Sequence, residues 1–206
     1  MKPLDIERKS FSIIAQELGD RKLDPEYDLL IRRVIHTTAD FEYADSLCFS
    51  EHAVLRMKEA IEKGSDIITD TTMAMSGINK KLLAKFGGQA RCFIADEDVA
   101  AEAKERGVTR SLVSMEKAAR LNKPLIFAVG NAPTALFSIC DLIRAGKLNP
   151  EMVIGVPVGF VNVVEAKEEL MRTAPHYIVA RGRKGGSNVA AAIVNSVLYQ
   201  LIEREE

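Results

Sequence analysis

From residue 66 onward, short and largely apolar runs alternate with segments of helical periodicity. The apolar runs lie at 66–69, 91–94, 124–129, 152–156 and 177–180, and the helical segments lie at 98–106, 112–121, 133–145, 162–172 and 187–203. A strand that is apolar along its length must be covered on both faces, as the strands of a parallel sheet are. The alternation therefore predicts an α/β fold, namely a three-layer α/β/α domain with a mainly parallel sheet of about five strands.

Three amphipathic helices are expected before the first strand, within residues 6–18, 24–38 and 50–64. The second should have Pro25 in its first turn, and Ser50 should cap the third.

Composition bounds the class of protein. With 206 residues, 47% hydrophobic and 28% charged, the chain can bury one substantial core, and we expect a single domain over 1–206. No apolar run approaches the roughly 20 residues that span a bilayer, and the first residues lack a signal peptide's apolar stretch, so a cytoplasmic protein without a membrane partner is expected. The formal net charge of -1 argues against a nucleic-acid partner. The three cysteines lie far apart in apolar sequence and should be buried, which favours neither disulfides nor a metal site.

His36 is the candidate acid–base residue, because histidine exchanges protons near neutral pH. It falls off the apolar stripe of its predicted helix, on the side of Arg32 and Arg33, so it should face solvent or a ligand. Asp40 follows closely enough to orient the ring or stabilise its charge. A lone histidine is more often structural than catalytic, so both interpretations stay open at this point.

Ligands of a parallel sheet gather at the carboxyl ends of its strands. Thr71 follows the first predicted strand in a run of hydroxyls, small residues and methionines, which either lines a pocket or forms a capped turn over core methionines. Asn131 follows the third, where it could cap a helix whose free N–H groups would favour an anion. After the last strand, Arg181, Arg183 and Lys184 stand among glycines before a helix, as either an anion site or a solvated basic turn.

Common catalytic motifs are missing from the sequence. Neither the Walker phosphate loop nor the dinucleotide glycine fingerprint occurs, and no serine elbow accompanies a matching histidine and acid. The residues alone therefore lead to an α/β domain with a histidine, several cationic and helix-terminal donors, and an apolar pocket floor that contains methionines.

Five collinear segments extend this interpretation. They are Arg-Val-Ile-His-Thr-Thr-Ala-Asp-Phe (33–41), Thr-Asp-Thr-Thr-Met-Ala (69–74), Gly-Asn-Ala-Pro-Thr-Ala-Leu (130–136), Val-Pro-Val-Gly-Phe-Val (156–161) and Gly-Arg-Lys-Gly-Gly-Ser-Asn (182–188). Together they resemble the precorrin-8X methylmutase family over nearly the whole chain. The first and last segments resemble the cobalt-dependent, anaerobic branch of that family more than the cobalt-free one.

The resemblance implies an isomerase of cobalamin biosynthesis. Such an enzyme moves a methyl group within corrin ring C of cobalt-precorrin-8 to give cobyrinate, with no added cofactor, because any cobalt enters as part of the substrate. The family's acid–base histidine corresponds to His36, and its substrate-binding serine and arginine correspond to Ser10 and Arg110. Thr71, Asn131, Arg183 and Lys184 are carried over only as pocket lining.

The resemblance also implies a homodimer whose corrinoid sites lie at or near the subunit interface. A corrinoid carrier without turnover is the alternative, and an enzyme that depends on a nucleotide is disfavoured by the missing phosphate motifs.

Overall fold

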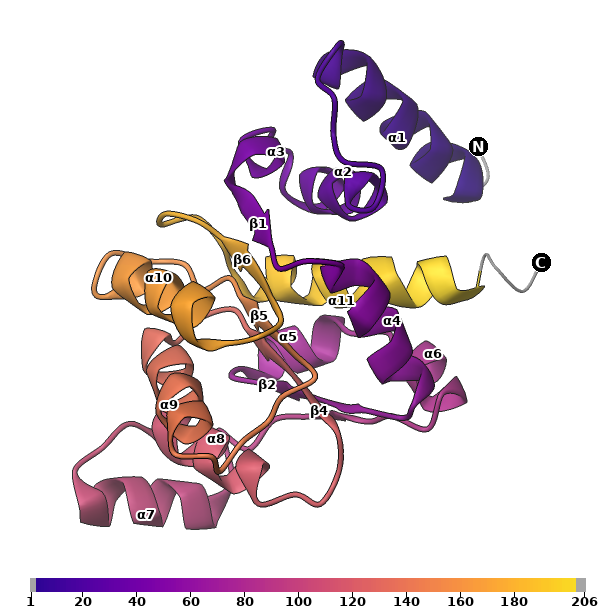
Figure 1. The fold of residues 1–206 in the computed structure, drawn as a ribbon. Coiled ribbons are helices and arrows are strands. Elements are labelled where there is room, and N and C mark those ends of the chain that lie inside the picture. Colours follow the sequence, from indigo (N-terminus) through magenta and orange to yellow (C-terminus); the bar gives the residue numbers. More distant parts are fainter. Residues whose placement is uncertain (1–2, 203–206) are drawn as a thin grey trace.

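A six-stranded sheet forms the middle layer of the computed structural model, which describes residues 3–202 (Figure 1). The strands are β1 (Leu47–Phe49), β2 (Asp66–Thr69), β3 (Ala90–Arg91), β4 (Leu125–Val129), β5 (Met152–Gly155) and β6 (Tyr177–Ala180), and their order across the sheet is β1-β6-β5-β4-β2-β3. All neighbouring strands are parallel except β1, which pairs antiparallel with β6. The predicted fold class is confirmed.

Two strands differ from the sequence prediction. The antiparallel edge strand β1 was not expected, because three residues are too few to show a period. The strand expected at 91–94 is shorter and earlier, at Ala90–Arg91, so this edge of the sheet is narrow.

Eleven helices surround the sheet within residues 3–202. They are α1 (Pro3–Leu18), α2 (Asp28–Thr38), α3 (Tyr43–Ser46), α4 (Ala53–Glu62), α5 (Thr72–Gly77), α6 (Lys80–Lys85), α7 (Glu97–Arg106), α8 (Arg110–Ala119), α9 (Pro133–Arg144), α10 (Val163–Thr173) and α11 (Ser187–Ile202). None of them is long and apolar enough to cross a membrane. Residue 203, the expected last residue of α11, lies outside the described residues.

Some helix starts differ from expectation. The segment after Asp24 first forms a turn, so α2 begins at Asp28 and Pro25 lies before it. Ser50 does not cap α4: its hydroxyl accepts a hydrogen bond from the backbone N–H of Tyr177, and His52 precedes the helix with a left-handed φ of 55°. The run at 69–79, expected as pocket lining or a capped turn, forms the short helix α5, which Thr71 caps, and ends at Asn79, the N-cap of α6.

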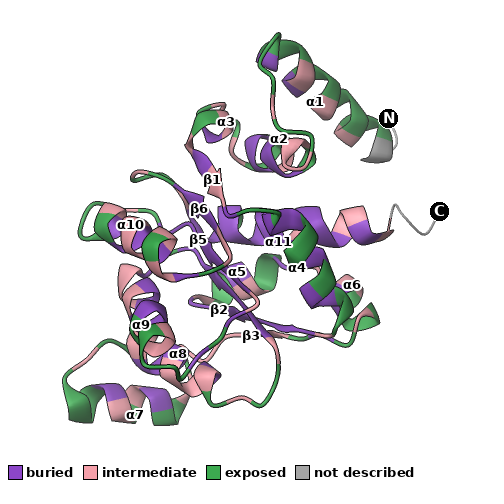
Figure 2. Ribbon diagram, viewed as in Figure 1, coloured by how far each residue is buried: buried purple, intermediate pink, exposed green. Residues whose placement is uncertain are grey.

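Successive residues of the strands point to opposite faces of the sheet and contribute to two separate hydrophobic cores. Ile126 of β4 and Ile154 of β5 pack with α2, α4 and α11, whereas Phe127 and Val153 pack with α8, α9 and α10 on the opposite face. α11 is almost wholly buried, because the sheet covers one side of it and α2 covers another (Figure 2). The cysteine prediction holds only for Cys140, since Cys48 and Cys92 are half-buried.

Asp66 is a buried carboxylate at the start of β2. It accepts hydrogen bonds from Arg91 Nε at 2.7 Å, Lys123 Nζ at 2.7 Å and the backbone N–H of Gln89 at 2.9 Å. Burial alone would raise the pKa of Asp66, but the bonds from Lys123 and Arg91 outweigh it and lower the pKa below its ordinary value of 3.8. The ionised carboxylate therefore joins β2, β3 and the segment before β4.

We predict that Asp66→Asn lowers the free energy of unfolding by about 2 kcal/mol at pH 7, because two cations lose their buried partner. A lowered native pKa contributes stability above pH 3.8, so the difference between the two proteins should narrow as the pH falls below that value. Chemical denaturation at pH 3 to 7 measures both effects.

Asp98→Asn is the matched control, because Asp98 also pairs with a lysine, Lys117 at 2.7 Å, but is 67% exposed. It should change the stability little. Equal losses for the two variants would contradict the proposed role of burial.

Candidate active site

His36 lies in the last turn of α2 and is exposed, as its place off the apolar stripe predicts. Its Nδ1 is 2.8 Å from the hydroxyl oxygen of Ser10, which comes from α1. The imidazole also stacks on Phe11, with ring centroids 5.4 Å apart and planes inclined by 25°. Two neighbouring residues of α1 therefore fix the ring from one side, while the rest of it faces outward.

Arg33 explains why α1 lies where it does. Its guanidinium pairs with Glu7 of α1 and lies 4.7 Å from the centroid of the Phe11 ring. On the other side it lies 5.1 Å from the centroid of Tyr199 on α11. One side chain thus links α1, α2 and α11, and it does so one turn before His36.

Asp40 does not act as the expected partner of His36. It accepts a hydrogen bond from Lys184 Nζ at 2.6 Å, and this bond lowers the pKa of Asp40. Lys184 also pairs with Glu42 at 2.9 Å. The turn after α2 is therefore attached to the loop after β6, and the side chain that orients His36 is Ser10 instead.

The expected anion site at the start of α9 is filled by the protein itself. The backbone N–H groups of Gly130, Asn131 and Ala132 donate to the Asp70 carboxylate at 2.9, 2.8 and 2.7 Å. Burial raises the pKa of Asp70, and the three donors oppose that effect. The Asn131 side chain is exposed and does not cap the helix, whose N-cap is Ala132. An external carboxylate or phosphate finds these donors already occupied.

Thr71 has two structural contacts. Its hydroxyl caps α5 by accepting from the Ala74 N–H at 3.1 Å, and it lies 2.8 Å from the hydroxyl of Ser187 at the start of α11. The loops after β2 and β6 therefore meet. Met73, in the helix that Thr71 caps, is 71% exposed, so it is not a core methionine.

The cationic loop after β6 is largely neutralised. Arg181 pairs with Glu168 at 2.9 Å, and Lys184 pairs with the two acids near α2. Arg183 forms no ion pair with residues 3–202; its guanidinium lies 5.4 Å from the ring centroid of Phe160. Of the three cations expected to attract an anion, only Arg183 is free of a carboxylate.

Lys167 of α10 forms hydrogen bonds to the backbone of that loop. Its side chain has no exposed surface, and its amine donates to the carbonyl oxygens of Gly182 at 2.7 Å and Lys184 at 2.8 Å. Burial lowers the pKa of Lys167 to about 8. Sequence reasoning missed this residue, although its place beside Val163, Ala166 and Leu170 on the buried face of α10 could have indicated it.

Arg110 is the first residue of α8 and is exposed, without an ion pair to the described part of the chain. The neighbouring Thr109 caps α8 and hydrogen bonds to Thr134 at 3.1 Å, so α8 and α9 begin side by side. However, α8 and the α1 helix that carries Ser10 lie at opposite ends of the molecule (Figure 1). Within one chain, the structure brings Ser10 to His36 but leaves Arg110 apart from both.

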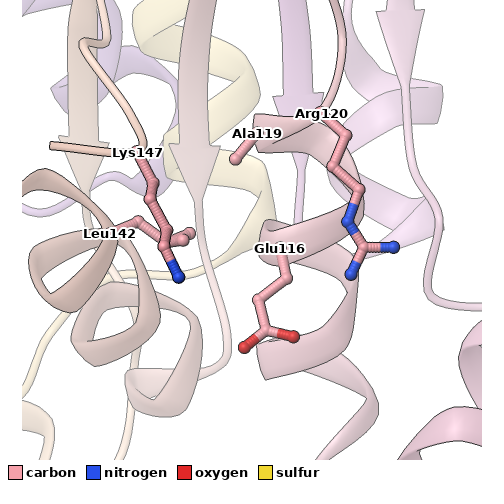
Figure 3. Close-up of a pocket in the computed structure, with 5 residues that line it drawn as sticks. All are labelled: Glu116, Ala119, Arg120, Leu142 and Lys147. Carbon is pink, nitrogen blue, oxygen red and sulfur yellow. The ribbon is translucent and has the colours of Figure 1, made fainter. Parts of the chain in front are cut away.

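A pocket of about 400 Å³ lies on the α8–α9 side of the sheet (Figure 3). Its lining residues are Glu116, Ala119, Arg120, Leu142 and Lys147. It contains none of the predicted site residues, and its charges are mixed. Among residues 3–202, no group of three or more histidine, cysteine or acidic side chains is arranged to hold a metal ion.

Comparison with known proteins decides the family. A family model described as precorrin-8X methylmutase matches residues 5–200. The chain belongs to the precorrin-8X methylmutase family. The resemblance read from the five sequence segments is confirmed, and membership in this family places the chain among the isomerases.

Relatives from both branches of the family match nearly full length. The cobalt-precorrin-8 methylmutase of Salmonella typhimurium is 46% identical over 98% of this chain and 97% of its own length. The cobalt-precorrin-8 methylmutase of Priestia megaterium is 42% identical over 96% of this chain and 88% of its own length. The precorrin-8X methylmutase of Pseudomonas aeruginosa is 36% identical over 93% of each chain.

A crystal structure of the precorrin-8X methyl mutase from Thermus thermophilus has the same fold. It superposes with a TM-score of 0.87 at 37% identity and covers 97% of this chain and 98% of that chain. The sheet order and helix layers described above are therefore those of this methylmutase family.

The buried amine of Lys167 generates a prediction about pH. An unfolded lysine keeps its proton up to about pH 10.5, whereas the native amine releases it above about pH 8, so the unfolded state binds more protons between these values. The free energy of unfolding of the wild type should therefore rise with pH in this window, relative to Lys167→Met. Denaturant titrations from pH 7.5 to 10 measure the difference, and two curves that stay parallel would show that the native pKa is not lowered.

Proposed function

We propose that this chain catalyses the methyl shift of cobalt-precorrin-8, giving cobyrinate, with His36 as the acid–base residue. Family membership already identifies it as a methylmutase of cobalamin biosynthesis. The cobalt form is favoured because the relatives at 40–46% identity are named cobalt-precorrin-8 methylmutases. The observation that carries the residue assignment is the exposed His36 ring, held by Ser10 at 2.8 Å.

The reaction makes small demands on the protein. The carbon–carbon bond to the migrating methyl breaks as the bond to the adjacent ring carbon forms, so no nucleophile is required. His36 lends a proton to the macrocycle and recovers it after the shift. Ser10 and Phe11 keep the imidazole in one orientation, which makes proton transfer effective only if the corrinoid is held equally firmly. Cobalt, when present, belongs to the substrate and no other cofactor takes part.

The carboxylates on the edge of a corrinoid suit Arg183 and Arg110, which are exposed and form no ion pair with residues 3–202. Arg183 and Arg110 each offer a planar guanidinium that can bind a carboxylate through two hydrogen bonds. Lys184, Thr71 and Asn131 would add polar contacts at the same edge of the sheet. These five residues, with Ser10, make up the proposed substrate-binding set.

We further propose a homodimer in which each site draws on both copies. Ser10 and Arg110 lie on helices at opposite ends of one chain, so a partner is needed to bring the Arg110 side near the His36 side (Figure 1). Apolar side chains exposed on α1 and α2, namely Ile6, Ile13 and Leu29, supply surface for such an interface.

We predict that His36→Ala abolishes turnover but leaves corrinoid binding nearly unchanged, because the proton donor is lost while the binding groups remain. The visible spectrum follows conversion of cobalt-loaded and metal-free precursor in separate reactions, and equilibrium titration of product follows binding. The proposal expects the cobalt-loaded form to be converted faster.

Thr37→Ala is the control, since Thr37 is the exposed neighbour of His36 and its hydroxyl donates to the Arg33 carbonyl of its own helix. It should keep its activity. Undiminished conversion by the His36 variant would refute the acid–base role, and a wild type that binds product but converts neither precursor would favour the carrier alternative.

A mixing experiment tests the shared site. His36→Ala and Arg110→Ala should each be inactive alone, but dimers formed from an equal mixture should regain about a quarter of wild-type activity, because half are mixed and each mixed dimer has one intact site. Unfolding and refolding the two variants together, each with a different affinity tag, forms the mixed dimers, and capture through both tags verifies them. No recovered activity in verified mixed dimers would show that each chain builds its own site.

A further inference from the structure

We propose that Lys167 is a positioning residue that holds Arg183 in the orientation that binds a substrate carboxylate. The inference rests on the proposed function, because it takes Arg183 as a contact for the corrinoid. Nothing in the methyl shift itself uses the Lys167 amine, which is buried and has no route to a ligand. Its role must therefore be sought in what it contacts.

The contacts of Lys167 flank a single residue. Its amine donates to the carbonyl oxygens of Gly182 and Lys184, the two immediate neighbours of Arg183. The Gly182 carbonyl lies in the peptide plane directly before Arg183, and the Lys184 carbonyl lies in the plane after Lys184. The two bonds therefore fix the backbone on both sides of Arg183, which limits the directions in which its side chain can leave the loop. The Arg183 side chain itself is left exposed.

The rest of the loop is attached to the segment after β5. The carbonyl oxygen of Arg183 accepts from the Gly159 N–H at 3.1 Å, and the Gly186 N–H donates to the Val156 carbonyl at 2.9 Å. A Cβ on Gly185 would come within 2.1 Å of that same carbonyl oxygen. Lys167 thus supplies a further attachment of the loop, on the side that faces α10.

An apolar side chain could fill the same space without the cost of burying an amine. The amine is therefore explained by its two acceptors, since removing it would leave two carbonyl oxygens without their donor. Lys167 differs in this respect from an ordinary core residue such as Leu170, one turn later on the same buried face of α10.

Arg183 has the surroundings that a carboxylate-edged, apolar macrocycle requires. Its guanidinium lies against Phe160, which is 82% exposed, and Val161 beside it is 78% exposed. The ring supports the flat guanidinium and offers apolar surface next to it, so one ligand can contact both.

The test compares Lys167→Met, Arg183→Ala, their double variant and Lys167→Arg in the full chain. Leu170→Val is the control for stability, because it loosens the core on the same helix and its side chain has no donor for the loop carbonyls. Steady-state kinetics with cobalt-precorrin-8 provides kcat and KM, and titration with cobyrinic acid measures binding without turnover.

We expect Lys167→Met to raise KM and the dissociation constant about tenfold while kcat stays within about twofold, as loss of uniform binding does. Arg183→Ala should have a similar effect, and the double variant should be no worse than either single one, because both changes remove the same contact. Lys167→Arg should return both constants toward the wild-type values, and Leu170→Val should leave them unchanged.

Effects that multiply in the double variant, or an equal rise in KM with Leu170→Val, would overturn the positioning role. If the wild type converts neither precursor, the proposed function fails, and the binding constants for cobyrinic acid still decide the positioning role. A wild type that binds no cobyrinic acid would overturn both proposals.

Discussion

The candidate site depends on hydrogen bonds that join the loops at the carboxyl ends of the parallel strands. Asp70 binds the loop after β4, Thr71 meets Ser187 at the start of α11, and Lys167 holds the loop after β6. A parallel sheet exposes these ends together, but it does not by itself fix the loops. Their rigidity comes from polar groups that bond to one another, which leaves few of them for a ligand.

This internal satisfaction changes how the basic and polar motifs are interpreted. Charged and N–H groups that look like anion sites in the sequence are mostly paired inside the protein, as Asp40 with Lys184 and Asp70 with the start of α9 demonstrate. The exceptions carry more information. Arg110 and Arg183 form no ion pair with residues 3–202, and both are exposed on the helices and loops that follow the strands.

The layers and the parallel strands could be predicted, because strands that are buried on both faces need apolar residues at successive positions, and such runs are visible in the sequence. β1 and the six-residue helices α5 and α6 could not, since they are too short to show a period. The contact between Ser10 and His36 spans 26 positions, so the residues alone did not reveal it, and only the family resemblance pointed to both. Asp40 was assigned to His36 by nearness in sequence, but Lys184, 144 positions away, binds it instead.

α1 lies beyond α2, on the side away from the sheet, and this position has a consequence for how the protein could lose its activity (Figure 1). α1 packs mainly on α2, carries both groups that orient the imidazole, and contributes Ile14 and Leu18 to the core on that face of the sheet (Figure 1). Detachment of this one helix would strip the histidine of its neighbours and leave the sheet intact. In that case activity would be lost before the sheet melts, so the melting temperature of the whole fold would overstate the temperature at which the enzyme still works.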